Sequence, residues 1–447
     1  MRTFKTDGFP LRASLTLFAL VLSTTSAAAG QTWWVDDDGG TGIDFTQIQP
    51  AIDAAQSGDL IVVHAGSYRG FSLQKGLTIL GTGAGNTSVV RGTVMVTGVP
   101  GFERAVLSGL SLRPMVEYFD VDNQQNVLAS PLALGVDSNL GPVILDNLEF
   151  DNPLGELGPR VSINECADAR LYQCVVKGYG SFSFANGMDG VQVVNSHVEV
   201  VDSYLRGGDG GADWYGGPGG LGGDGLDASN SIVSVHRSTC LGGDGGDAGD
   251  DNTAVVIGGD GGHGLRLDGG SVALIGGIPS DRLEPGPGGI ATCWLSCTDG
   301  APGFGLLLLG ASVARHSGVT IVSESVTPGS VASPAVPADP TLHRTGLLKA
   351  GDVQTFSITG PPGEAVTFHF GRKAVVLPGP LPGMDNLVTH DRSIQLGPIP
   401  PTGELQFNFT IPTGLPAGFT LFAQAEITSA SGPRLTSSLP LVVRLFP

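Results

Sequence analysis

Two adjacent carboxylates and one imidazole are the residues whose types point most directly to acid–base chemistry. Asp250 and Asp251 follow Gly249, and His263 stands between two glycines twelve positions after Asp251. Paired carboxyl groups can protonate a glycosidic oxygen and activate a water molecule. The sequence therefore offers Asp250, Asp251 and His263 as candidate catalytic residues for the cleavage of a glycosidic bond.

Further carboxylates recur in a glycine-rich segment around this set. Residues 207–270 contain 23 Gly, ten Asp and two Arg, and the sequence GGDG begins at positions 207, 222, 242 and 258. Carboxylate and carbonyl oxygens are the ligands that Ca²⁺ prefers, so calcium is the candidate cofactor. The alternative is a set of metal-free loops in which Gly supplies positive φ and Asp supplies turn hydrogen bonds. The candidate metal ligands are Asp224, Asp227, Asp244 and Asp247.

Two stretches of this segment match the first six positions of the calcium-binding nonapeptide GGxGxDxUx, namely 222–227 and 242–247. The large apolar position of that repeat is occupied by Ser229 in one copy and Gly249 in the other. The copies are also not nine residues apart. Because the apolar core residue is missing, the sequence does not predict a calcium β-roll.

Exposed aromatic rings are the remaining signal of binding. Trp214 and Tyr215 lie within the glycine-rich segment, and Tyr118 lies in an irregular stretch, 114–142, that we expect to be a long loop. Rings on loops can stack on the faces of sugars, so these three residues are candidate binding residues. The alternative is that the rings fold back over the backbone of their own loops.

The N-terminus has the features of a secretory signal. Basic residues precede the apolar stretch 13–23, and Ala27, Ala28 and Ala29 form a small-residue cleavage site. We therefore expect residues 1–29 to be a signal peptide and the mature protein to be secreted or extracytoplasmic, in the periplasm or at the cell surface. No later segment has the length to span a membrane. The formal net charge of -19 argues against nucleic acid as a partner.

Five cysteines in an exported chain allow two disulfides and one unpaired thiol. The pairs that are close in sequence are Cys166 with Cys174 and Cys293 with Cys297, which leaves Cys240. The sequence does not fix the connectivity, and free buried thiols are the alternative.

Short strand-like segments that would carry these residues recur along the chain. The segment 195–211 aligns without a gap on 230–246, at an offset of 35 residues. Self-similarity of this kind is typical of a solenoid, in which each coil buries its apolar face against its neighbours. A short helix after Thr46, with Ile48 and Ile52 on one face, would cover the open end of such a stack.

The opening of the chain resembles the right-handed parallel β-helix proteins of the pectin-lyase-like superfamily. The residues that carry the resemblance are FTQIQPAIDAAQSGDLIVVHAGSY (45–68) and KGLTILG (75–81). In that superfamily they mark the N-terminal cap and the first coils. The Asp-Asp and Gly-His-Gly sequences around Asp251 and His263 also look like motifs of its polygalacturonases. Their partner motifs Asn-Thr-Asp and Arg-Ile-Lys are missing, and twelve residues are too few for a typical coil.

The fold prediction is therefore all-β: a right-handed parallel β-helix over 30–323, with a short N-terminal cap helix. A Pro-rich linker follows at 324–340. Residues 341–447 alternate in strand fashion between Pro-Gly turns, which predicts a small antiparallel β-sandwich.

Two functions fit this sequence. The first is a secreted structural or interaction module, stabilised by calcium, that contacts a polysaccharide or a cell-surface component. The alternative is a polysaccharide lyase or glycoside hydrolase. A lyase needs a base beside its acidic cluster, and the bases near these acids are Arg206, Arg237 and Arg266.

Overall fold

The structure is a computed structural model. It describes residues 30–81, 88–113, 132–150, 160–178, 180, 185–249, 256–276, 281–293, 296–317, 319–334, 341–344, 353–359, 362–371, 374–378, 385–388, 392–401, 404–410, 420–429, 432–435 and 439–442. The predicted signal peptide, 1–29, lies outside these ranges. Within the described part of the chain, no helix has the length and hydropathy to cross a membrane.

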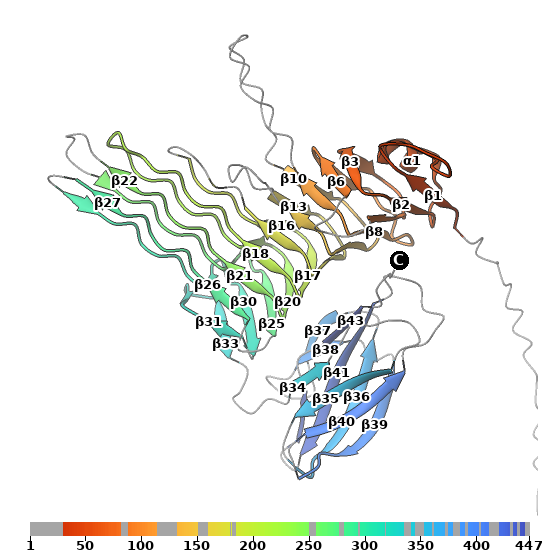
Figure 1. Cartoon of the computed structure of the whole chain (residues 1–447). Coiled ribbons are helices and arrows are strands. Elements are labelled where there is room, and N and C mark those ends of the chain that lie inside the picture. Colours follow the sequence, from red (N-terminus) through yellow and green to blue (C-terminus); the bar gives the residue numbers. More distant parts are fainter. Residues whose placement is uncertain are drawn as a thin grey trace, which may run out of the picture.

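Three parallel sheets dominate the described chain (Figure 1). Sheet A contains, in spatial order, β1 (Thr32–Val35), β2 (Leu60–Val63), β5 (Thr78–Gly81), β8 (Ala105–Ser108), β11 (Val143–Asp146), β14 (Ala169–Tyr172), β17 (His197–Val201), β20 (Ile232–His236), β25 (Val272–Gly276), β30 (Val313–Ser317) and β33 (Val331–Pro334). Sheet B contains β3 (Gly66–Arg69), β6 (Ser88–Arg91), β9 (Ser111–Arg113), β12 (Glu149–Phe150), β15 (Val175–Lys177), β18 (Tyr204–Arg206), β21 (Thr239–Leu241), β26 (Arg282–Glu284) and β31 (Thr320–Ile321). Sheet C contains β4 (Ser72–Leu73), β7 (Val94–Thr97), β10 (Leu132–Asp137), β13 (Arg160–Asn164), β16 (Val191–Val194), β19 (Leu226–Ser229), β24 (Leu265–Asp268), β29 (Leu306–Leu308) and β32 (Glu324–Val326).

Nine successive coils, from β2–β3–β4 to β30–β31–β32, each contribute one strand to each sheet, and β1 and β33 extend sheet A at its two ends. This part of the chain is therefore a parallel β-helix, and the fold prediction is confirmed. The repeat at an offset of 35 is confirmed by the strand register, because His197 pairs with Ile232 and Leu205 pairs with Cys240. Residues that are equivalent in the sequence repeat therefore stack directly on one another in space.

The core of the β-helix is a set of apolar columns along its axis. Val198 and Val200 of β17 are fully buried, and they stack on the equally buried Val233 and Val235 of β20. Branched side chains suit this arrangement, because they pack well on a pleated surface that lies against neighbouring coils.

The corners between the strands repeat as well. At the corner between sheets C and A, Asn195 and Asn230 adopt positive φ, which short polar side chains tolerate. The serine that follows each of them points inward, and Ser231 Oγ accepts a hydrogen bond from Ser196 N–H at 3.1 Å. Ser271 Oγ accepts from Ser231 N–H at 3.0 Å in the same way. Side-chain hydroxyls thus satisfy backbone donors that no strand pairing reaches.

The N-terminal end of the stack is covered by the one helix of the described chain, α1 (Ile48–Ala54), as expected (Figure 1). Ile48, Ala51 and Ile52 are buried. The N-cap of this helix is Gln47 rather than Thr46, and no side chain caps it. Apolar burial against the first coil therefore holds this short helix in place, rather than a capping hydrogen bond.

Two predicted irregular stretches take part in the β-helix. In the predicted loop at 114–142, residues 114–131 lie outside the described ranges, while β10 (Leu132–Asp137) pairs with β7 and β13. In the predicted linker at 324–340, β32 pairs with β29, and β33 pairs with β30. The parallel sheets thus extend to Pro334.

The C-terminal part consists of antiparallel sheets, as predicted. The strands are β34 (Thr341–Arg344), β35 (Val353–Thr359), β36 (Ala365–Gly371), β37 (Ala374–Pro378), β38 (Asp385–Val388), β39 (Arg392–Pro398), β40 (Glu404–Thr410), β41 (Thr420–Ser429), β42 (Gly432–Leu435) and β43 (Leu439–Val442). Phe356 and Phe407 of one sheet contact Phe368 of the other, with ring centroids 5.3 and 4.8 Å apart. Three aromatic rings therefore form the centre of this domain's core.

The cysteines form one disulfide, between Cys293 and Cys297. Cys166, Cys174 and Cys240 are buried and take part in no disulfide. Cys166 and Cys174 occupy corner positions that serines occupy in later coils, since their N–H groups donate to Ser196 Oγ and Ser203 Oγ. The second pair suggested by the sequence is therefore not formed.

Candidate functional site

Three successive coils replace the connection from sheet B to sheet C with a long pair of arms. The arm pairs are residues 207–225, 242–264 and 285–305, and each runs out from sheet B and returns to sheet C. Residues 250–255 and 294–295 of these arms lie outside the described ranges. Figure 1 shows the arms as parallel runs that extend far to the side of the sheets, toward β22 (Ala248–Gly249) and β27 (Ala291–Thr292). We call the three arm pairs together the glycine slab.

The outgoing arms are joined to one another by backbone hydrogen bonds at every third residue. Gly207 N–H donates to Leu241 O at 2.9 Å, and Gly210 N–H donates to Asp244 O at 2.8 Å. The returning arms follow the same rule, with Gly222 N–H donating to Asp260 O at 2.8 Å. A period of three is that of a polyproline II helix, whose backbone groups point outward and can bond to neighbouring chains.

A second set of hydrogen bonds joins the outgoing layer to the returning layer. Gly223 N–H donates to Gly208 O, and Gly243 N–H donates to Gly223 O, both at 2.8 Å. Gly262 N–H continues the column by donating to Gly243 O at 2.8 Å. The slab is thus two layers of extended chain with a hydrogen-bonded glycine interior.

The glycines of the slab are required by close approach rather than by backbone conformation. A Cβ on Gly207 would lie 1.9 Å from Gly223 O, and one on Gly243 would lie 2.0 Å from Gly208 O. Among the described glycines of the three arm pairs, Gly216 alone has positive φ. The expectation that these glycines supply positive φ was therefore wrong, because their function is to let two backbones touch.

The aspartates of the slab accept hydrogen bonds from the backbone of the next coil. Asp224 N–H donates to Asp189 Oδ1 at 2.8 Å, and His263 N–H donates to Asp224 Oδ1 at 2.7 Å. The pattern ends at Phe304, whose N–H donates to His263 Nδ1 at 2.9 Å. We call this column the acceptor ladder. It satisfies the one N–H of each triplet that the two sets of backbone bonds leave over.

The outer edge of the slab carries proline where an unpaired donor would otherwise stand. In the outgoing layer Gly207 N–H donates to Leu241 O, and Gly242 N–H, which follows Leu241, donates to Glu284 O. The residue that follows Glu284 on the last arm is Pro285. On the returning layer Gly261 N–H donates to Ala301 O, and Pro302 follows. Proline has no N–H, so at these two positions the edge exposes no backbone donor to which another chain could add.

The four predicted metal ligands have other partners. Asp247 Oδ1 accepts from Ile290 N–H at 2.8 Å, and Asp244 pairs with Arg206 at 3.2 Å. Arg266 Nη1 lies 3.9 Å from Asp224 Oδ2, and Arg266 Nε lies 4.0 Å from Asp227 Oδ1. In the described part of the chain, the group of three acids close enough to hold an ion is Asp36, Asp37 and Asp38. Calcium at the four predicted residues stays a prediction.

Burial raises the pKa of a ladder carboxyl that lies close to sheet C, Asp224. Asp224 is 6 % exposed, and burial followed by the nearby Asp189 raises the pKa of its carboxyl to about 7. Burial and Asp189 also raise the pKa of Asp227. These carboxyls are therefore held closer to their neutral form than surface acids are.

The predicted catalytic set is only partly described. Asp250 and Asp251 lie outside the described ranges. The ring of His263 stacks on Phe304 with centroids 5.7 Å apart, and its Nδ1 accepts the Phe304 N–H. Burial lowers the pKa of His263. The one lone pair that a neutral imidazole offers is therefore committed to the backbone, and His263 has a structural role in the ladder.

The predicted aromatic residues of the slab are exposed. Trp214 and Tyr215 are 57 % and 78 % exposed, at the turn between the two arms of the first pair. The ring of Trp214 lies against the next arm pair, because a Cβ on Gly249 would lie 2.5 Å from Cε3 of that ring. Tyr215 N–H donates to Asp213 Oδ1 at 2.7 Å. Trp214 thus rests on the backbone of the neighbouring arm and still presents much of its surface, and sugar binding at these rings stays a prediction. Tyr118 lies outside the described ranges.

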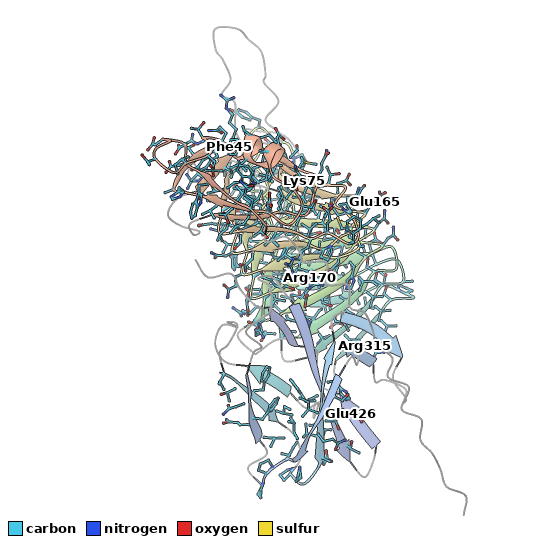
Figure 2. The ribbon with its side chains drawn as sticks, turned by 90° about the vertical axis from the view of Figure 1, so that its right-hand side faces the viewer. Phe45, Lys75, Glu165, Arg170, Arg315 and Glu426 are labelled. Carbon is cyan, nitrogen blue, oxygen red and sulfur yellow. A yellow bond between two sulfur atoms is a disulfide. The ribbon has the colours of Figure 1, made fainter. Side chains whose placement is uncertain are left out.

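A buried cluster of charges on sheet A is absent from the sequence prediction. Arg170 and Glu199 occupy paired positions on β14 and β17 and are 8 % and 4 % exposed. Arg170 Nε donates to Asp168 Oδ1 at 2.6 Å, and Tyr172 Oη donates to Glu199 Oε2 at 3.0 Å. Figure 2 labels Arg170 on the β-helix. The strand-like segments ARLYQCVV (169–176) and VEVVDSYL (198–205), when aligned, place this arginine over this glutamate.

Opposing effects set the charges of this cluster. Burial raises the pKa of Glu199 to about 7, although Arg170 and Tyr172 act in the other direction. Burial alone would lower the pKa of Arg170, but Tyr172 and Asp168 raise it. Because these side chains are almost fully covered, the cluster is not an open groove for a polymer. We interpret it as an internal ion-pair network of sheet A.

A hydroxyl, an imidazole and a carboxylate also form a chain in the antiparallel domain. His369 Nδ1 lies 2.8 Å from Ser393 Oγ, and His369 Nε2 lies 3.2 Å from Glu426 Oε2. Glu426 is labelled in Figure 2. Ser393 is the direct cross-strand partner of His369 on β39 and β36. Cross-strand polar contacts of this kind stabilise sheets, and we interpret the chain in that way.

Comparison with known proteins identifies no relative: no family model, no curated protein and no solved structure matches the chain. The parallel β-helix therefore rests on the strand pairing itself. Membership of the pectin-lyase-like superfamily stays a prediction from the motifs at 45–68 and 75–81.

Proposed function

We propose that the chain is a secreted, non-catalytic interaction module that presents Trp214 and Tyr215 of the glycine slab to a carbohydrate at a cell surface or in a surrounding matrix. Residues 1–29 supply the export signal in this proposal. The β-helix serves as the support from which the slab projects.

The observation that carries the proposal is the exposure of two large rings on a backbone that is fixed by hydrogen bonds. Trp214 and Tyr215 are among the more exposed large apolar residues of the described chain. Asp213 N–H donates to Asp247 O at 2.8 Å, which anchors the residue before Trp214 to the neighbouring arm. Large rings on a rigid support lose little conformational entropy on binding, which favours their use at binding sites.

The slab is also better suited to binding than to catalysis. In the ladder, the carboxylate of Asp224 and the imidazole of His263 each accept a backbone N–H. Groups that are committed in this way hold the arms together, and they are poorly placed to transfer protons to a substrate.

The test is a panel of neutral, acidic and amino-containing polysaccharides, with binding measured for the wild-type chain and for Trp214→Ala and Tyr215→Ala. We expect each substitution to weaken binding by about 1.5 kcal/mol, or roughly tenfold. Phe102→Ala is the matched control, because Phe102 is 90 % exposed and belongs to an N-terminal coil. Equal binding by wild type and Trp214→Ala would refute the proposed site. Turnover of any polysaccharide would favour the lyase or hydrolase alternative instead.

A further inference from the structure

The glycine slab is an anionic surface without basic residues of its own. The three arm pairs, 207–225, 242–264 and 285–305, contain nine Asp and no Lys or Arg. The single histidine in these ranges is His263, whose pKa is lowered by burial. At neutral pH the arms therefore carry no cationic side chain.

The arginines nearest to the slab lie where its arms join the sheets, and they already contact aspartates. Arg206 contacts Asp209 at 2.7 Å and Asp244 at 3.2 Å. Arg266 lies within 4.0 Å of Asp224 and Asp227. These ion pairs neutralise part of the charge there, while the arms farther out keep their negative charge.

The aspartates farther out along the arms are exposed, and each accepts a backbone N–H with Oδ1. Asp247 uses Oδ1 for Ile290 N–H, and Asp260 uses Oδ1 for Ala301 N–H at 2.7 Å. Both residues are exposed. Because Asp213 N–H bonds to Asp247 O, Asp247 lies on the arm next to that of Trp214, and its carboxylate accepts Ile290 N–H from the third arm pair. An exposed aromatic ring and an exposed aspartate are thus presented on neighbouring arms.

From this juxtaposition we infer that the ligand of the slab is a cationic amino-sugar polymer. This inference rests on the proposed function and specifies its ligand. An ammonium group is attracted both by the faces of Trp and Tyr rings and by nearby carboxylates, while the sugar ring stacks on the aromatic face. The same surface repels an acidic polysaccharide.

The experiment compares four soluble probes by titration calorimetry: oligomers of glucosamine, the same oligomers N-acetylated, oligogalacturonate, and an oligolysine peptide. We expect the glucosamine oligomers to bind about tenfold more tightly than the acetylated ones. Their binding should weaken at high salt, because exposed charges are screened. Trp214→Ala should lose about tenfold in affinity for both glucosamine-based probes.

Asp247→Asn separates the contribution of charge from that of structure. Asparagine keeps an Oδ1 acceptor for Ile290 N–H but removes the negative charge. We expect this variant to bind glucosamine oligomers several-fold more weakly, to bind the acetylated oligomers as the wild type does, and to unfold at the same temperature. Asp53→Asn, on an exposed face of α1, is the matched control and should change nothing.

The outcomes separate the inference from the proposed function. Binding of acetylated oligomers or oligogalacturonate without a preference for glucosamine would overturn the inference and leave a carbohydrate-binding slab. Absence of binding to all the sugars would overturn both. Equal affinity for oligolysine and for glucosamine oligomers would overturn the assignment to a sugar, since charge alone would then explain the binding.

Discussion

Asp224 Oδ1 accepts the backbone N–H of His263 of the next coil, at a distance of 2.7 Å. The bond joins residues that are 39 positions apart in the sequence. Glycine and aspartate have complementary roles in the slab. Glycine lets the backbones of neighbouring arms approach, and the aspartate accepts the one N–H of each triplet that bonds to no backbone carbonyl.

The first prediction concerns this bond. Asp224→Ala leaves the partly buried His263 N–H without its acceptor, and we expect a loss of about 1 to 3 kcal/mol in the free energy of unfolding. Asp224→Asn keeps an acceptor at the same place and should retain most of the stability. Thermal unfolding followed by circular dichroism measures both variants. If the two variants unfold at the same temperature, the ladder does not contribute in the way described.

The second prediction concerns close packing in the slab. A Cβ on Gly243 would lie 2.0 Å from Gly208 O, so Gly243→Ala must push two layers apart. We expect a destabilisation of about 2 to 3 kcal/mol and weaker binding at Trp214. Gly101→Ala is the control, because its Cβ would meet no atom closer than 3.7 Å. A Gly243→Ala variant as stable as the control would contradict the packed slab.

The third prediction concerns pH. Burial raises the pKa of both Glu199 and Asp224 to about 7 in the folded protein. A carboxyl group whose pKa is raised on folding stabilises the folded state below its unfolded pKa, and that contribution is lost as pH rises to about 7. The stability contributed by these two groups should therefore fall between about pH 4 and pH 7.

Denaturant unfolding at a series of pH values measures this effect. Glu199→Gln cannot ionise, so its stability should depend less on pH than that of the wild type in this window. The same substitution at an exposed acid, Glu165→Gln, serves as the control. Identical pH profiles for Glu199→Gln and the wild type would show that Glu199 does not titrate as described.

The fourth prediction concerns the thiols. Cys166, Cys174 and Cys240 are buried thiols outside any disulfide, and Cys293 is bonded to Cys297. Iodoacetamide should therefore modify no cysteine of the folded protein, three cysteines in denaturant, and all five after reduction in denaturant. Intact-mass spectrometry counts the modifications. Modification of a single cysteine in denaturant without reductant would indicate a second disulfide instead.

The sequence by itself determined the stacked, parallel architecture. The repeat at an offset of 35 predicts the strand register that pairs His197 with Ile232. The apolar face of Ile48 and Ile52 predicts the helix that covers the end of the stack. Both signals are local or strictly periodic. Strand alternation and a helical face are therefore visible without knowledge of what lies nearby in space.

Tertiary structure alone decided what the glycines, the acids and the buried charges do. A glycine that permits positive φ and one that permits contact at Gly243 look identical in a sequence. An aspartate that binds calcium and one that accepts a distant N–H, as Asp224 does, also look identical. Arms of unequal length separate the partners, so no fixed spacing reveals them. The pairing of Arg170 with Glu199 likewise depends on which coils are neighbours, and this is set by the register of whole strands.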